Sequence, residues 1–245
     1  MDSHDPVSIA LVEAIRTGDL DSLAMLLGEH PGLASERIDE GSGKSRTPLH
    51  ETADWPGYFP GGPAVVRALI EAGADPSAPV LGASHTETPL HWAASSDDAD
   101  VAAELLDGGA DIEAPGGSIG TPLDNAVGYG CWHVARLLAG RGARINGLWQ
   151  AAALGLMPRV EELLACEPPP TPEELDQAFW QACHGGQRRV AEYLLDCGAD
   201  LNGHPGYSDQ TPADVAAALD TRRENLVTWL SERGARSAQE IAQLR

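Results

Sequence analysis

Residues 88–111 read TPLHWAASSDDADVAAELLDGGAD, a stretch that combines a helix start, two short apolar segments and a helix stop. Threonine followed by proline favours a helix N-cap, because proline at the first helical position loses only an N–H that has no partner inside the helix. The closing Gly109-Ala110-Asp111 follows a Leu-Leu pair, where a left-handed C-cap favours glycine. The stretch therefore predicts two short helices joined by a turn.

Both ends of this stretch recur along the chain. The opening tetrapeptide appears as Thr47-Pro-Leu-His50, Thr88-Pro-Leu-His91, Thr121-Pro-Leu-Asp124 and Thr211-Pro-Ala-Asp214. The closing tripeptide appears as Gly73-Ala-Asp75, Gly109-Ala-Asp111, Gly142-Ala-Arg144, Gly198-Ala-Asp200 and Gly234-Ala-Arg236. Three further copies, called the worn repeats below, lack the tetrapeptide and are placed by their turn glycine and Leu-Leu pair. Seven repeats then begin near 9, 47, 88, 121, 146, 177 and 211. Trp149 and Trp180 then align with the histidine of the tetrapeptide.

In these markers the chain resembles the ankyrin repeat family, whose unit of about 33 residues carries the pattern T-P-L-H-x-A. The resemblance covers nearly all of the sequence and is to a bacterial-type ankyrin repeat protein. It implies an all-α solenoid of about seven helix–turn–helix repeats, joined by hairpin fingers and curved around a concave groove. It also implies a single domain over 1–245 with a C-terminal capping segment at 237–245, a role in protein–protein recognition, and structural hydrogen bonds from His50 and His91 to the backbone of the next repeat.

Three departures from a regular repeat are informative. The second repeat has 26 residues between its markers (47 to 73) against 21 in the third (88 to 109), and the extra residues form the aromatic, proline-rich stretch 55–63. Such a composition predicts a shaped loop at the end of the inner helix. The hairpin before the third repeat is lengthened around His85 and Glu87. Between Gly142 and Asn146 the hairpin is almost absent, which predicts a kink before Leu148.

The charge of the chain excludes several classes of partner. The formal net charge is −21, and residues 1–123 hold 21 acidic and five basic side chains. A field of that sign repels phosphate backbones and anionic lipids, so we expect neither nucleic acid nor membrane as a partner. We also expect a cytoplasmic protein. The acidic start is unlike a signal peptide, and no run approaches the ~20 apolar residues of a membrane span. The four cysteines form no C-x-x-C pair.

The candidate site follows from helix geometry. The residue after each tetrapeptide and those three and four further on share one side of a helix, which we expect to face the groove. With the lengthened hairpin included, the predicted binding residues are Glu51, Asp54, Trp55, His85, Glu87, Trp92, Asn125, Tyr129, Gln150 and His184. Glu51 and Asp54 repel each other unless a cation lies nearby, and an indole face holds a cation with about 0.5–2 kcal/mol. The pattern predicts binding of an arginine, lysine or other cation, presented by a protein segment or a cationic small molecule.

Catalytic signatures are missing from the sequence: we find no G-x-S-x-G elbow, phosphate-binding glycine loop, H-E-x-x-H helix or dinucleotide fingerprint. No cofactor is predicted, and no metal, since His85-x-Glu-x3-His91 lacks a third ligand. The leading hypothesis is a non-catalytic recognition scaffold. The alternatives are a small-molecule binder or enzyme that uses acid/base side chains in the same groove, and an adaptor recognised through its outer face. Solvation of the carboxylates and core packing of the tryptophans remain open as simpler explanations.

Overall fold

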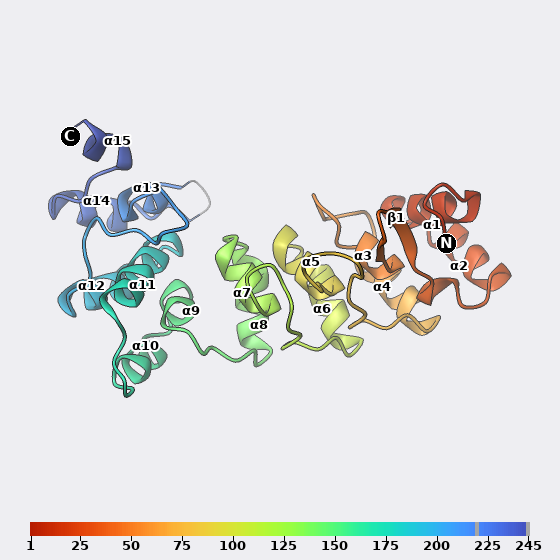
Figure 1. Ribbon diagram of the computed structural model, residues 1–245, viewed down its shortest axis with the longest axis horizontal. Coiled ribbons are helices and arrows are strands. Elements are labelled where there is room, and N and C mark those ends of the chain that lie inside the picture. Colours follow the sequence, from red (N-terminus) through yellow and green to blue (C-terminus); the bar gives the residue numbers. More distant parts are fainter. Residues whose placement is uncertain (219–220, 244–245) are drawn as a thin grey trace. The chain divides into compact units, whose positions relative to one another are not determined.

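The computed structural model describes residues 1–218 and 221–243, and its contacts divide the chain into two compact units, Met1–Arg144 and Ile145–Arg245. The division falls where the sequence lacks an inter-repeat hairpin. Within each unit the helices pair into repeats, as the all-α prediction requires (Figure 1). Among the described residues, no helix is long and apolar enough to cross a membrane.

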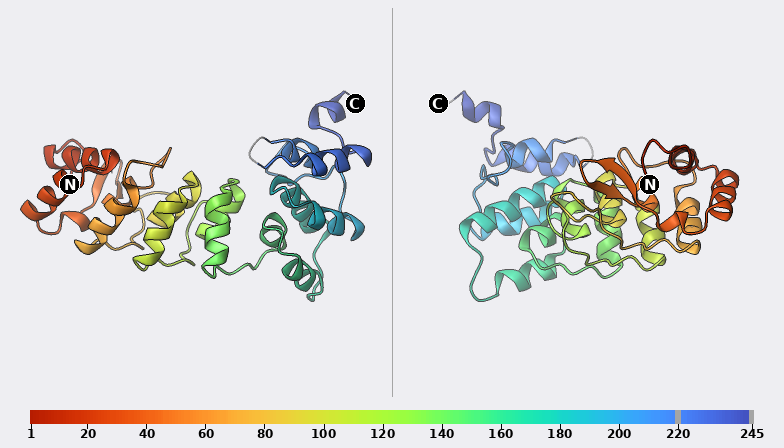
Figure 2. Two further views of the ribbon diagram at one scale, coloured as in Figure 1. Left: turned by 180° about the vertical axis from the view of Figure 1, so that it is seen from behind. Right: turned by 45° about the vertical axis from the view of Figure 1, so that its right-hand side comes forward.

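The first unit contains four helix pairs and one small sheet. Helices α3, α5 and α7 form its inner layer and α4, α6 and α8 its outer layer, preceded by α1 and α2 (Figures 1 and 2). The bounds are α1 (Pro6–Thr17), α2 (Leu20–Glu29), α3 (Pro48–Glu51), α4 (Gly62–Glu71), α5 (Pro89–Ser96), α6 (Ala99–Asp107), α7 (Pro122–Gly128) and α8 (Trp132–Gly140), with a 3-10 turn at Leu33–Ser35. Buried aliphatic side chains from both layers form the core, among them Leu11, Leu23, Leu49, Leu69, Leu90, Leu105, Leu123 and Leu138.

A two-stranded antiparallel sheet interrupts the helices of the first unit, at the place of the hairpin finger expected before the second repeat. Strands β1 (Ile38–Gly41) and β2 (Lys44–Arg46) pair across a tight turn that places Lys44 at the exposed tip. Ser45 exchanges two backbone hydrogen bonds with Leu81, of 3.0 and 2.9 Å. Gly82 lies so close to this turn that a Cβ there would approach Gly43 O to 1.9 Å. The sheet thus fixes the start of the lengthened hairpin that carries His85 and Glu87.

The tetrapeptide histidines connect neighbouring repeats, as expected. His50 Nδ1 accepts a hydrogen bond from the Thr47 N–H (3.2 Å), and its Nε2 lies 3.1 Å from Glu87 O. His91 repeats the arrangement, with Nε2 at 3.1 Å from Gly120 O. Because each acceptor immediately precedes the next threonine N-cap, one ring both caps its own helix and holds the following repeat.

The second unit stacks three helix pairs and a terminal helix. Its elements are α9 (Leu148–Ala153), α10 (Met157–Leu164), α11 (Pro172–His184), α12 (Arg188–Asp196), α13 (Pro212–Ala216), α14 (Glu224–Glu232) and α15 (Ala238–Ala242). Phe179, Val190, Leu194, Leu226 and Trp229 lie in its core. Helix α15 covers part of the predicted capping segment and is anchored where the Ala238 N–H donates to Asp214 Oδ2 (2.9 Å); residues 244–245 of that segment lie outside the described residues.

The worn repeats begin elsewhere than predicted. Their N-caps are Asp5, Gly147 and Thr171, where the sequence pattern gave positions 9, 146 and 177. In the fifth repeat Gln150, not Trp149, takes the place of the histidine, since its Oε1 accepts from the Gly147 N–H (2.7 Å). In the sixth repeat Trp180 does align with the histidine, and its Nε1–H donates to Gln210 O (2.7 Å).

Candidate functional site

The site begins with the short helix α3 and the loop that replaces its second turn. Asp54 begins the loop: its backbone oxygen accepts from the Gly57 N–H (2.7 Å), and its Oδ1 from the Trp55 N–H (3.0 Å). Tyr58 ties the loop to the third repeat, since its N–H donates to Asp98 Oδ2 (2.7 Å) and its hydroxyl to Asp97 O. The loop is therefore held at both sides, and it presents the Trp55 indole with 80% of its surface exposed.

Glu51 does not face the groove, in contrast to the prediction. Its side chain is fully buried, and its two oxygens accept from Arg46 Nε and from Arg16 Nη2 (3.0 Å). The same Arg16 nitrogen lies 2.6 Å from Asp54 Oδ2, and Arg46 also pairs with Glu40. The repulsion between Glu51 and Asp54 is thus relieved by the protein's own arginines. Burial without such partners would cost several kcal/mol.

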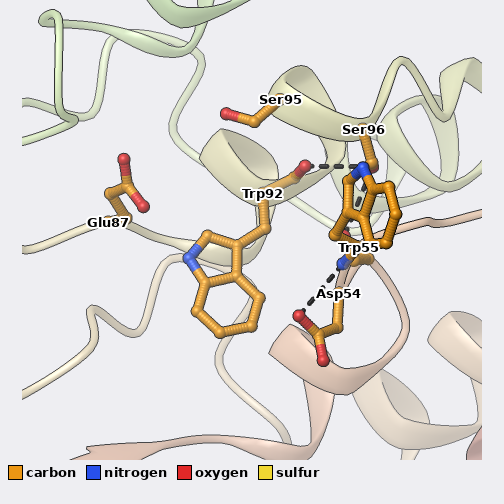
Figure 3. Close-up of a pocket in the computed structure, with 7 residues that line it drawn as sticks. Asp54, Trp55, Glu87, Trp92, Ser95 and Ser96 are labelled. Carbon is orange, nitrogen blue, oxygen red and sulfur yellow. Dashed lines mark hydrogen bonds between the residues drawn. The ribbon is translucent and has the colours of Figure 1, made fainter.

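A pocket of about 190 Å³ lies between the second and third repeats, lined by Ala53, Asp54, Trp55, Glu87, Trp92, Ser95 and Ser96. Figure 3 shows the Trp92 indole between Glu87 on one side and Asp54 on the other, with Trp55 near Asp54. The Trp92 ring meets His50 edge-on at 5.0 Å, and the Arg46 guanidinium lies 5.8 Å from its centre. Four of the predicted residues, contributed by two repeats, therefore surround one small cavity.

Glu87 is held in place by a polar network from the fourth repeat. Its Oε1 accepts from the Ser118 N–H (3.0 Å) and from Asn125 Nδ2 (3.1 Å). Asn125 Oδ1 in turn accepts from the Ile119 N–H (3.1 Å), and Ser118 bonds the Tyr129 hydroxyl (2.8 Å). Both hydrogen bonds that the described residues donate to the Glu87 carboxylate reach Oε1, so Oε2 remains for an external donor.

Sequence and structural comparisons identify the repeat type. Residues 60–147 match the family model for ankyrin repeats in three copies. Residues 60–147 are ankyrin repeats. The chain is also similar to the crystal structure of the human ASB11 ankyrin repeat domain, with 23% sequence identity, a TM-score of 0.53, and coverage of 92% of this chain and 98% of that one. At this identity the likeness shows the shared fold alone. No curated protein matches the sequence.

Ankyrin repeat domains generally mediate protein–protein interaction through the surfaces that their stacked repeats create. The predicted residues of the first unit other than Glu51 separate into three groups. Asp54, Trp55, Glu87 and Trp92 line the pocket. Asn125 is buried and supports Glu87, while Tyr129 is 53% exposed beside Ser118. His85 is exposed in the lengthened hairpin and does not line the pocket.

The two remaining predicted residues belong to the second unit. Gln150 is buried and caps α9, so it does not present its side chain as a groove residue would. The His184 ring is half-buried and packs against Trp180 with 5.1 Å between ring centres. His184 therefore stays a predicted contact of the second unit.

Sequence reasoning missed Arg16 and Arg46. The like charges of Glu51 and Asp54, one helical turn apart, did indicate a nearby cation. Arg16 lies 35 residues before Glu51 and Arg46 lies five before it, and no repeat pattern in the sequence assigns either arginine to that carboxylate. Metal binding gains no support from the structure. Among the described residues, no group of three or more His, Cys, Asp or Glu side chains could hold an ion. His91 uses both ring nitrogens in hydrogen bonds.

Proposed function

We propose that this ankyrin repeat protein is a non-catalytic recognition scaffold whose first unit holds an arginine or lysine side chain of a partner protein in the pocket between Trp55, Glu87 and Trp92. The observation that carries the proposal is the position of two indoles and the Glu87 carboxylate around one cavity. An indole face attracts a cation with about 0.5–2 kcal/mol, more when water is displaced. Glu87 Oε2 adds a charge-assisted hydrogen bond to the same ligand.

The size of the pocket favours a side chain over a free small molecule. Its volume is about 190 Å³, whereas pockets for drug-sized ligands span roughly 300–1,000 Å³. A long basic side chain fills such a cavity while its backbone stays outside. Exposed Ile119 and Tyr129 on the adjoining repeat supply apolar area that a protein segment can cover.

The alternative of an enzyme or small-molecule binder has less support. Glu51 and Asp54 are paired with arginines, which leaves them poorly placed to exchange protons with a substrate. Burial raises the pKa of Cys131 to about 11 and also raises the pKa of Cys183, so neither thiol is activated as a nucleophile. The chain's four unpaired cysteines support the proposal of a reducing, cytoplasmic location.

Selection of peptides from a random library on the wild-type chain tests this function. We expect the selected peptides to be enriched in arginine or lysine, and to bind Trp55→Ala and Glu87→Gln at least tenfold more weakly than wild type. The matched controls are Tyr207→Ala, which removes an exposed aromatic ring from the second unit, and Glu71→Gln, which removes an exposed carboxylate from an outer helix. Peptides without basic residues, or equal affinity for all four variants, would refute the proposal.

A further inference from the structure

The turns between paired helices of the second unit form a pocket that is lined by several arginines, although the chain as a whole is acidic. Its volume is about 330 Å³, and Arg188, Arg189 and Arg223 line it together with Gly186 and Asn225. The Gly186 turn packs against the third arginine, since a Cβ at Gly186 would lie 3.3 Å from Arg223 Cγ. Three arginines from two successive repeats therefore line one cavity.

The outer helices around this pocket begin differently from α2 and α6 of the first unit. At α2 the N-cap Asp19 accepts from the Ser22 N–H, and at α6 the N-cap Asp98 accepts from the Val101 N–H. At α8 the His133 and Val134 N–H groups donate to Asp97 of the preceding repeat, whereas α4 begins at Gly61 without a side-chain cap. Helices α10, α12 and α14 have no side-chain hydrogen bond from their N-cap residues. Their first-turn N–H groups add partial positive charge to the arginines.

Arginine at a helix N-terminus is unfavourable by about 0.3–1 kcal/mol, so neighbouring anions are expected. Two of the arginines in this region have them: Arg188 pairs with Glu192 (3.2 Å) and Arg222 with Glu224 (2.8 Å). Within 1–218 and 221–243, no carboxylate lies within ion-pair distance of Arg189 or Arg223, although Arg223 donates to Arg222 O (3.3 Å). Two positive charges at one cavity thus lack a carboxylate partner there.

We propose that this pocket binds a phosphate monoester carried by a side chain of a partner protein. A phosphate monoester has a charge of about −1.5 to −2 at pH 7, which two guanidinium groups neutralise. Arginine presents planar pairs of N–H donors that match phosphate oxygens bidentately. A long polyanion such as nucleic acid is disfavoured by the net charge of −21, whereas one compact anion meets only the local positive charge.

An NMR titration of the ¹⁵N-labelled chain tests the site. The probes are the peptide Ac-Gly-Gly-pSer-Gly-Gly-NH2, its unphosphorylated form, and inorganic phosphate. We expect the phosphopeptide to shift the backbone amides of residues 188–190 and 224–225 with saturation in the millimolar range, and to bind more tightly than inorganic phosphate. The double variant Arg189→Ala/Arg223→Ala is expected to weaken binding at least tenfold, and Arg236→Ala, which removes an exposed arginine elsewhere in the same unit, to leave it unchanged.

Three outcomes would overturn the proposal. Equal shifts with the unphosphorylated peptide would show that phosphate is not recognised. Equal affinity for inorganic phosphate and phosphopeptide would show that the carrying side chain contributes nothing. Equal weakening by Arg236→Ala would show that only the overall charge matters. Resonances remote from the pocket monitor folding of the variants, and the first-unit pocket is untouched, so failure here is independent of the function proposed for that pocket.

Discussion

His50 illustrates how a single buried ring can make stability depend on pH. Burial lowers its pKa to about 4, because desolvation penalises the charged ring; the hydrogen bond from Nε2 to Glu87 O raises the pKa but does not offset the burial. Burial lowers the pKa of His91 in the same direction. The unfolded chain, with ordinary histidine pKa values near 6.5, therefore binds protons that the folded chain excludes.

From this shift we expect the free energy of unfolding to be fully present above pH 6.5 and to fall as pH decreases toward 4. For His50 alone the loss between pH 7 and pH 5 amounts to about 2 kcal/mol. Urea denaturation at half-unit pH steps measures it, and an NMR titration of the ring should show His50 still neutral at pH 5. A His50 ring that protonates near pH 6.5 in the folded chain would contradict the prediction.

Glu51 shows where single-residue reasoning from sequence stops. Its register on an inner helix was correctly taken to place it beside Asp54, and the need for a cation was correctly inferred. The cation is supplied by Arg16 and Arg46, brought near by the packing of α1 and of β2. Periodicity predicts which side of a helix a residue occupies, but a partner from another element depends on tertiary packing, which a local pattern does not contain.

Successive inner helices are joined by one recurring hydrogen bond. His50, His91 and Trp180 each reach the carbonyl of the residue just before the next threonine N-cap, at Glu87, Gly120 and Gln210. Trp180 keeps the polar link through its indole N–H, in addition to its packing in the core. The intact T-P-L-H and T-P-L-D starts were predictable because their capping chemistry is local. The worn starts were not, since Gly147 and Gln150 form the same cap without the marker residues.

The substitution Trp180→Phe separates the link from the packing. We expect it to lower the free energy of unfolding of the second unit by about 1–2 kcal/mol, because the Gln210 carbonyl loses its donor while most of the apolar contact remains. Chemical denaturation measures the change. Trp55→Phe is the control, with an expected effect within about 0.5 kcal/mol because that indole is exposed. Equal effects of the two substitutions would show that the bond contributes nothing.

Over the full chain, charge is distributed in a way that bears on how partners approach. The sequence assigned most of the acidic excess to its first half, and the pocket proposed for a basic side chain lies there. The second unit, although acidic as well, concentrates arginines at one set of turns. This basic pocket was not predicted, because its arginines come from two repeats and become neighbours only when the repeats stack.

Electrostatic attraction between the first unit and a basic peptide is expected to act mainly on the association rate. Raising the salt concentration from about 20 to about 500 mM should lower the association rate constant at least tenfold, because screening shortens the range of the field. The dissociation rate constant should change much less. Stopped-flow fluorescence with an arginine-containing peptide selected on the wild-type chain measures both. An association rate that does not respond to salt would contradict electrostatic steering.

The β1–β2 hairpin has a practical consequence through Lys44, the one lysine in the sequence. Its exposed tip lies against the start of the finger that carries Glu87, since Ser45 and Leu81 are joined backbone to backbone. An amine-reactive fluorophore therefore modifies a single lysine side chain, at a defined point on the first unit, without any engineered cysteine. Quenching or energy transfer from that dye to a labelled peptide would report occupancy of the first-unit pocket in the otherwise unaltered chain.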